Sequence, residues 1–187
     1  MRIIRAAHRQ VMPWKNGGGT TAEIAVAPQG ASLDDFDWRI SMAHVGRDGP
    51  FSSFPGIDRT LSVLTGAGIT LAFGDGERVS LDRRSAPYPF AADRAVEGVL
   101  VDGSIDDLNV MSRRGRWRHR VARLAGAASL TANEGLLALV VGVGEWHVDG
   151  AVLAAGDSAI LEAPGPVDLT ASAGEAALYA VWLAADR

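Results

Sequence analysis

The chain contains no cysteine and a single lysine, Lys15, among its 187 residues. Without cysteine it cannot form a disulfide, a thiolate zinc site, an iron–sulfur cluster or a cysteine nucleophile. It has no run of 18 apolar residues, and its first ten residues lack the apolar stretch of a secretory signal. We therefore expect a cytoplasmic protein that does not cross a membrane.

The charge composition also narrows the range of partners. A net charge of −4 disfavours nucleic acid and anionic membranes, which proteins bind mainly through Lys and Arg. Of the 18 basic residues 17 are Arg, a bias typical of a GC-rich bacterial genome. Lys15 either has a role that only a compact ammonium can fill or occupies a neutral surface position.

Short β-type segments separated by turn signals predict an all-β chain. Asp149-Gly150 lies between two apolar segments and predicts a two-residue hairpin turn. The segment Val63–Ile69 is echoed by Leu139–Glu145, which indicates two related halves. The segment from Gly142 to Pro166 resembles a cupin repeat. We expect two halves, residues 1–115 with a ligand pocket and residues 116–187, in one compact unit.

Many cupins bind a metal through histidine and glutamate, so a metal site is the first possibility to test. The four histidines are His8, His44, His119 and His147, and no HxH pair is present. None of them follows a glycine turn at the spacing a metal site needs. We expect neither a metal nor another cofactor.

The N-terminal half contains the most chemically distinctive segment, Trp14-Lys15-Asn16-Gly17-Gly18-Gly19-Thr20-Thr21. Three successive glycines indicate backbone with positive φ angles or a close approach to another group. The segment is not a phosphate-binding P-loop, because its lysine precedes the glycines. The alternative is a plain glycine-rich turn before a strand.

Further candidates follow in the same half. In Asp37–Met42 the alternation places Arg39 on the face opposite Trp38 and Ile40, so Arg39 either points outward or lines a ligand cavity. Phe51 and Phe54 lie among turn residues, where they either form a lid or fill the end of the core.

A third group combines cations and an amide. Arg59 follows Asp58, and in the segment after Asp107 the residues Asn109, Met111 and Arg113 share one face of a strand. An arginine binds a carboxylate through two hydrogen bonds, and an amide orients a second polar group. Together these residues suit a small carboxylic acid.

The run from Arg113 to Arg120 alternates cations with apolar residues. Arg116, Arg118 and Arg120 share one face, with Trp117 and His119 on the other. This pattern is typical of a strand whose cationic face meets solvent or a second subunit, as in a homodimer. RNA binding is the alternative.

Four blocks of the chain resemble the HutD/Ves family. They are Trp14–Gly19, Trp38–Ser41, Asp48–Gly56 with Arg59, and Asp107–Met111 with Arg113. The resemblance implies a bicupin, or double jelly roll, and a link to histidine utilisation. It also implies a regulatory protein that senses a pathway intermediate such as a formylated glutamate or urocanate.

The leading hypothesis is a metal-free protein that binds a small anion in its N-terminal half. The residues assigned to the ligand site are Trp14, Lys15, Asn16, Arg39, Phe51, Phe54, Arg59, Asn109, Met111 and Arg113. The alternatives are a metal-free isomerase, epimerase or hydrolase acting on a small carboxylic acid, and a structural subunit. For an enzyme, Lys15 with Glu23 or His44 with Asp48 would transfer protons, while the catalytic residues stay unknown.

Overall fold

The computed structural model describes residues 1–14, 16–132, 135–162 and 165–186. Strands dominate this part of the chain, and its one helical element is the single 3-10 turn η1 (Ala6–His8). None of the described residues belongs to a helix with the length and apolar character needed to span a bilayer. The prediction of an all-β chain is confirmed.

The chain divides into two compact units. The N-terminal unit comprises residues 10–117, and the C-terminal unit comprises residues 1–9 together with 118–187. The expected boundary at residue 115 lies two residues before this division. The first nine residues, however, join the C-terminal unit, because β1 (Arg2–Ile4) pairs there with β17 (Ser158–Leu161).

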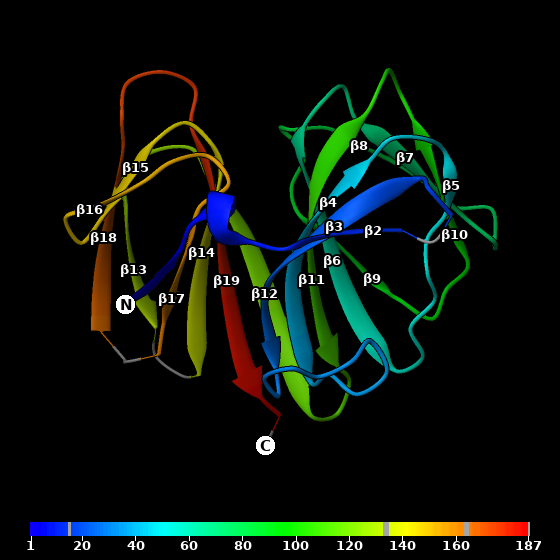
Figure 1. Ribbon diagram of the computed structural model, residues 1–187, viewed down its shortest axis with the longest axis horizontal. Helices are drawn as coiled ribbons and strands as arrows, with labels where there is room; N and C mark the ends of the chain where they lie inside the picture. The colour runs from blue at the N-terminus through cyan, green and yellow to red at the C-terminus, as the bar shows by residue number, and fades with distance from the viewer. Residues whose placement is uncertain (15, 133–134, 163–164, 187) are drawn as a thin grey trace. The chain divides into compact units, whose positions relative to one another are not determined.

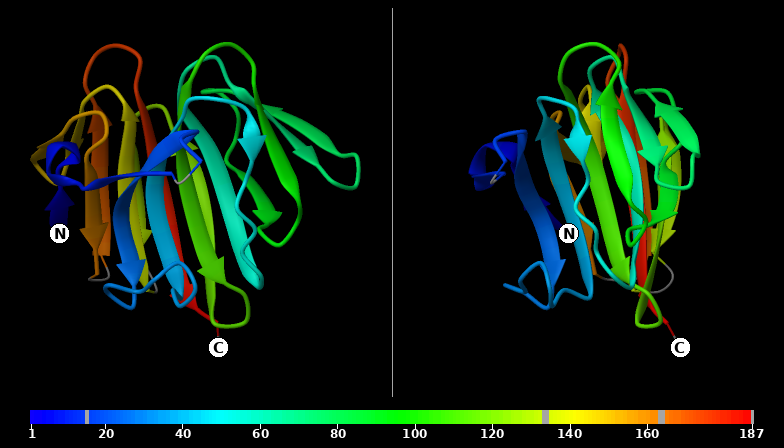
Figure 2. Two further views of the ribbon diagram at one scale, coloured as in Figure 1. Left: turned by 45° about the vertical axis from the view of Figure 1, so that its right-hand side comes forward. Right: turned by 90° about the vertical axis from the view of Figure 1, so that its right-hand side faces the viewer.

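The N-terminal unit consists of two sheets, with strand orders β2-β3-β4-β11-β6-β9 and β5-β10-β7-β8. In the first sheet β3 and β4 lie side by side in Figure 1 and in both views of Figure 2, as their antiparallel register requires. The strands are β2 (Val11–Pro13), β3 (Gly19–Ala27), β4 (Trp38–Val45), β5 (Gly49–Pro50), β6 (Ile57–Thr65), β7 (Ile69–Phe73), β8 (Arg78–Leu81), β9 (Tyr88–Ala91), β10 (Val96–Leu100) and β11 (Ile105–Arg113).

Apolar side chains from both sheets form the core of this unit. Leu61 and Val63 of the six-stranded sheet pack with Leu71, Phe73 and Val96 of the four-stranded sheet. These strands alternate apolar residues with polar ones, so one face of each sheet is free to pack on the other. The result is an open β-sandwich.

The C-terminal unit repeats this arrangement, with sheets ordered β1-β17-β14-β19-β12 and β13-β18-β15-β16. Its core contains Leu139, Trp146 and Leu178, all fully buried. The remaining strands are β12 (Trp117–Leu124), β13 (Ala128–Ala132), β14 (Leu136–Val143), β15 (Trp146–Val148), β16 (Ala151–Leu153), β18 (Gly165–Ala171) and β19 (Ala177–Ala185).

The hairpin predicted at Asp149-Gly150 joins β15 to β16. Both turn residues have positive φ angles, +46° at Asp149 and +81° at Gly150. This is the conformation that lets a two-residue turn follow the twist of its strands. The hairpin prediction is confirmed.

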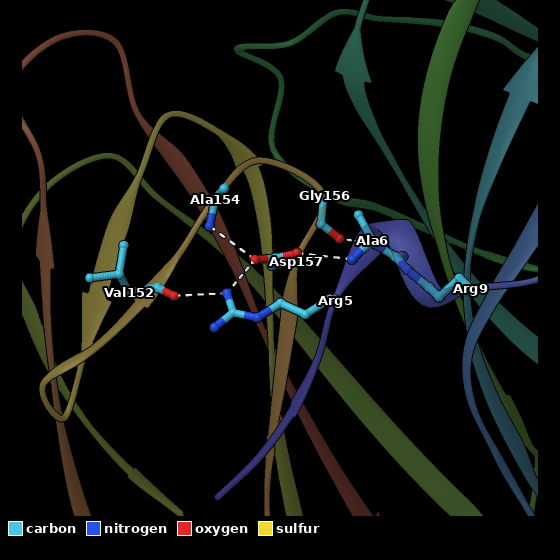
Figure 3. Close-up of polar contacts among 7 residues, drawn as sticks. All are labelled: Arg5, Ala6, Arg9, Val152, Ala154, Gly156 and Asp157. Atoms are coloured by element: carbon cyan, nitrogen blue, oxygen red, sulfur yellow. Dashed lines mark hydrogen bonds and ion pairs between the residues drawn. The ribbon is translucent and has the colours of Figure 1, made fainter.

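Asp157 attaches the N-terminal segment to the C-terminal unit (Figure 3). One of its carboxylate oxygens accepts a hydrogen bond from Ala6 N–H at 2.9 Å, and the other accepts one from Arg5 at 2.7 Å. The backbone N–H of Ala154 donates to the same carboxylate at 3.2 Å. Arg9 also donates a hydrogen bond to the Gly156 carbonyl. One buried carboxylate therefore orders both η1 and the turn before β17.

Candidate functional site

The N-terminal unit contains a cavity of about 800 Å³ over one face of its six-stranded sheet. Strands β3, β4, β11 and β6, which are neighbours in Figure 1, contribute its floor. Their register places Arg39, Ser41 and Ala43 of β4 opposite Met111, Asn109 and Asp107 of β11. The lining residues are Met12, Pro13, Trp14, Asn16, Gly18, Thr21, Glu23, Ala31, Ser32, Leu33, Arg39, Ser41, Ala43, Val45, Arg47, Asp48, Gly49, Pro50, Phe51, Ser52, Phe54, Arg59, Asp107, Asn109 and Met111.

A row of three buried polar residues crosses the floor. Arg59 donates two hydrogen bonds to the Asn109 side-chain oxygen, the one from Nε at 2.8 Å. The Asn109 side-chain nitrogen in turn donates to Oδ1 of Asp107. Because a guanidinium can only donate, Arg59 fixes which way the Asn109 amide faces. The row is therefore oriented from a cation, through an amide, to an acid.

Burial shifts the ionisation of both ends of this row. Burial lowers the pKa of Arg59 to about 10, and the charge of Asp107 raises it in part, so the guanidinium stays cationic at neutral pH. Burial raises the pKa of Asp107 to about 7, although Arg59 and the hydrogen bond from Asn109 act in the opposite direction. Asp107 can therefore gain or lose a proton near neutral pH.

A second buried arginine, Arg39, has a different partner. Its Nε donates to the Glu23 carboxylate at 2.9 Å, so its charge is matched within the protein. Arg59 differs, because within the described residues no carboxylate oxygen lies in ion-pair distance of its guanidinium. A buried cation that donates its hydrogen bonds to a neutral amide is suited to an anionic ligand.

Aromatic side chains enclose the charged groups. The guanidinium carbon of Arg59 lies 4.6 Å from the centre of the Phe51 ring. Phe54 packs edge-on against Phe36, and its backbone N–H is bonded to the Ala92 carbonyl. Phe51 and Phe54 thus join core clusters while they also line the cavity, so the two alternatives for these residues both hold in part.

The glycine-rich loop forms one wall. Gly17 has a φ of +69°, and a Cβ atom at Gly19 would overlap the His44 carbonyl and come within 3.1 Å of the Trp14 ring. The Trp14 indole N–H donates to Thr21 at 2.7 Å, and the Asn16 side-chain oxygen accepts from Gly18 N–H. Gly19 is needed because backbone and ring pack too closely for a side chain, whereas Gly17 is suited to its positive φ angle.

The cavity also has an apolar lip. Met12 and Leu33 line it, yet about half of each side chain is exposed, 49% and 53%. Exposed apolar groups beside a polar floor fit a ligand with a carboxylate at one end and less polar atoms at the other.

The structure brings eight of the ten predicted ligand residues to this cavity. They are Trp14, Asn16, Arg39, Phe51, Phe54, Arg59, Asn109 and Met111. Lys15 lies outside the described residues. Arg113 does not line the cavity, because it lies at the end of β11 and donates to the backbone carbonyls of Phe36 and Asp34.

Sequence reasoning left Asp107, Glu23 and Ser41 out of the ligand site. The signal for Asp107 was present, because it lies two residues before Asn109 and so shares its strand face. The pair proposed between His44 and Asp48 does not form. His44 contacts Asp106 at 2.9 Å on an exposed surface, and Asp48 accepts a hydrogen bond from Leu100 N–H.

The run from Arg113 to Arg120 has the pattern expected of a strand whose cationic face is exposed. Arg118 and Arg120 are exposed, and Arg120 stacks 3.6 Å from the centre of the Trp182 ring. Arg116 pairs with Asp37 at 2.9 Å, and Arg118 with Asp186 at 3.4 Å.

The described part of the chain contains no group of three or more His, Cys, Asp or Glu side chains placed to hold a metal ion.

These features define a double cupin with a buried polar cavity in its N-terminal unit. The chain matches the HutD family over residues 6–179 and belongs to that family. It is 33% identical to the protein Ves of Citrobacter koseri over 78% of this chain and 75% of that protein. It is also 35% identical, over 70% of this chain and 67% of the relative, to an uncharacterised 21.2 kDa protein in the hutC 3′ region of Pseudomonas putida.

Solved structures agree with this assignment. The structure of HutD from Pseudomonas fluorescens SBW25 superposes with a TM-score of 0.88 at 28% identity, covering 100% of this chain and 99% of that one. A cupin barrel protein from Leptotrichia buccalis shares the fold at 12% identity, with a TM-score of 0.59 over 97% of this chain and 95% of that one. The bicupin prediction and the HutD/Ves resemblance are confirmed, and membership links the chain to histidine utilisation.

Proposed function

We propose that this protein binds a small anionic intermediate of histidine utilisation and acts as a cytoplasmic regulator rather than as an enzyme. The observation that carries the proposal is Arg59, a cation that is 7% exposed and bonded to the amide of Asn109. A ligand carboxylate beside Arg59 would supply the counter-charge that a buried cation requires. The apolar lip and the cavity volume fit an acid of the size of a formylated glutamate or urocanate.

Isothermal titration calorimetry of the purified protein with N-formyl-L-glutamate and with urocanate tests this function. We expect one of the two acids to bind the folded protein with a stoichiometry of one. Arg59→Met should raise its Kd by about 30-fold or more, because truncating one partner of a desolvated charge pair costs roughly 2–5 kcal/mol.

Arg94→Met is the matched control. Arg94 belongs to the same unit, but it pairs with Asp75 and Glu77 away from the cavity, so this variant should keep the wild-type Kd. If the folded wild-type protein binds neither acid, or if both variants lose the same affinity, the proposed function is wrong.

An enzyme acting on the same acids is the second candidate, and Asp107 is the observation that favours it. A carboxyl group with a pKa of about 7 at the wall of a cavity is suited to accept and return a proton. Incubating the acids with the protein and following them by NMR separates the two functions. A regulator returns both acids unchanged, whereas an isomerase, epimerase or hydrolase converts one of them.

A further inference from the structure

Asp107 is the one member of the polar row with a buried side-chain atom that lacks a hydrogen-bond partner. The residue is fully buried in the sheet and lines the cavity. Its Oδ1 accepts the hydrogen bond from Asn109, while its Oδ2 is buried without a hydrogen-bond partner. A buried polar atom without a partner is costly, and this one belongs to a residue that lines the cavity, so a bound ligand is the partner we consider for it.

The charges around Asp107 decide which contact that is. The charge of β6 that acts on Asp107 is Arg59. The charged residue of β4 that lines the cavity is Arg39, which Glu23 of β3 already pairs. Asp106 precedes Asp107 and its charge contributes to the raised pKa of Asp107, while its side chain contacts His44 and Thr65. The remaining charged residues that line the cavity are Arg47, bonded to the Asn16 carbonyl, and Asp48, bonded to Leu100 N–H.

Among the described residues that line the cavity, Arg59 is therefore the one buried cation without a paired carboxylate, and it faces one buried acid, Asp107. An anionic ligand would add a second negative charge beside that single cation in a poorly solvated space. Two carboxylates sharing one site cannot both stay ionised at low cost, so one of them takes up a proton. The acid with a free oxygen and no direct cation contact is Asp107.

We infer that Asp107 takes up a proton when a carboxylate binds beside Arg59 and donates it, through Oδ2, as a hydrogen bond to the ligand. This inference rests on the proposed function and makes Asp107 a residue that determines specificity. The site would select acids that present a hydrogen-bond acceptor, a carbonyl or carboxylate oxygen, next to Asp107. An ammonium group at that position would keep Asp107 ionised.

Proton uptake can be counted by calorimetry in pairs of buffers with different ionisation enthalpies, Mes and imidazole at pH 6 and Hepes and Tris at pH 8. The probe is N-formyl-L-glutamate, whose two carboxyl groups are ionised throughout the range from pH 6 to pH 8, and glutarate is the second probe. At pH 8 the wild-type protein should take up most of one proton per ligand, and less at pH 6, where free Asp107 is already protonated. Above pH 7 the affinity should fall by up to about tenfold per pH unit.

Asp107→Asn is a permanently neutral substitute that still donates a hydrogen bond. It should bind the probe with the wild-type affinity at pH 6, take up no proton and show a flat pH dependence to pH 8. Asp106→Asn is the matched control, since it neutralises the adjacent, more exposed acid. Loss of the Asp106 charge lowers the pKa of free Asp107 and keeps it ionised at pH 8, so this variant should still take up a proton there.

The outcomes separate the inference from the function on which it rests. Binding without proton uptake in the wild-type protein, or unchanged uptake in Asp107→Asn, overturns the inference and leaves the proposed function standing. If the protein binds neither N-formyl-L-glutamate nor glutarate, the inference is overturned. If it does not bind urocanate either, the proposed function is wrong as well. If a thermal melt shows that Asp107→Asn does not fold, the proton count of the wild-type protein decides alone.

Discussion

Two arginines in one cavity show how a single neighbour sets the role of a side chain. Arg39 and Arg59 are buried to the same degree, 6% and 7% exposed. Glu23 neutralises Arg39 directly, which leaves Arg39 as part of the wall. Arg59 contacts the amide of Asn109, and an amide satisfies hydrogen bonds without neutralising charge. The two arginines differ in their partners, and because the partner of Arg59 is neutral, Arg59 can still attract an anion.

Gly19 is a second residue whose role depends on its surroundings. It begins β3, where its α-carbon faces the His44 carbonyl and the Trp14 ring. We expect Gly19→Ala to lower the free energy of unfolding by about 1–3 kcal/mol, because the added methyl group overlaps backbone that cannot rotate away. Urea denaturation followed by tryptophan fluorescence measures this loss.

The control for that measurement is Gly49→Ala. A Cβ atom at Gly49 meets no atom within 4 Å, so this substitution should change stability little. Equal losses of unfolding free energy at the two positions would show that close packing does not explain the need for glycine at position 19.

At the scale of elements, Asp157 is the anchor that holds β1 and η1 on the C-terminal unit. Burial alone would raise the pKa of Asp157, but the hydrogen bonds from Ala6 N–H, Arg5 and Ala154 N–H together outweigh it and lower the pKa below its ordinary value. A carboxyl group whose pKa is lower in the folded state stabilises the fold above its unfolded pKa. That contribution disappears as the pH falls through the folded pKa.

We therefore expect the C-terminal unit to lose stability as the pH falls below about 4, and Asp157→Asn to remove that part of the pH dependence. At pH 7 the variant should expose the amides of β1 to hydrogen exchange, because Arg5 loses its ionic partner. Exchange measured by mass spectrometry at pH 7 and thermal melts between pH 3 and pH 7 check both effects.

Asp168→Asn is the control, since Asp168 lies on β18 outside these contacts. A β1 that stays protected in Asp157→Asn would contradict the anchoring role.

At the scale of the whole molecule, each unit has its own sheets and its own core. Every described residue that lines the cavity belongs to the N-terminal unit. A bound acid should therefore stabilise that unit, by about 2.7 kcal/mol at a concentration of 100 times Kd. The C-terminal unit should gain nothing from direct contact.

Hydrogen exchange with and without N-formyl-L-glutamate tests this expectation. Amides of β6 and β11 should exchange more slowly with the acid, while those of β14 and β19 should not change. The Arg59→Met variant, which is expected not to bind, provides the baseline. Protection spread equally over both units would show that the ligand acts on the whole chain rather than on the N-terminal unit.

Much of the fold and part of the candidate site could be predicted from the sequence, because these features depend on residues that are close together in the chain. Alternation of apolar and polar residues marks strands, and Asp-Gly marks a hairpin, since both depend on backbone geometry over a few residues. The same period of two placed Asn109 and Met111 on one strand face and Arg39 on the face opposite Trp38 and Ile40, but it left open whether Arg39 points to solvent or to a cavity. Arg113 shares that period, but the strand ends there and the side chain turns to the carbonyls of Phe36 and Asp34.

The sequence by itself determined the all-β class, the duplicated cupin halves and the family, because these follow from strand periodicity, turn chemistry and motifs in order. Only the tertiary structure decided that β4 and β11 are neighbours, that Glu23 rather than a ligand neutralises Arg39, and that Asp107 keeps an unpartnered oxygen. Periodicity tells which face a side chain takes, but not which distant strand lies beside it. Charge pairing and burial depend on that neighbour, and so does the chemistry of the cavity.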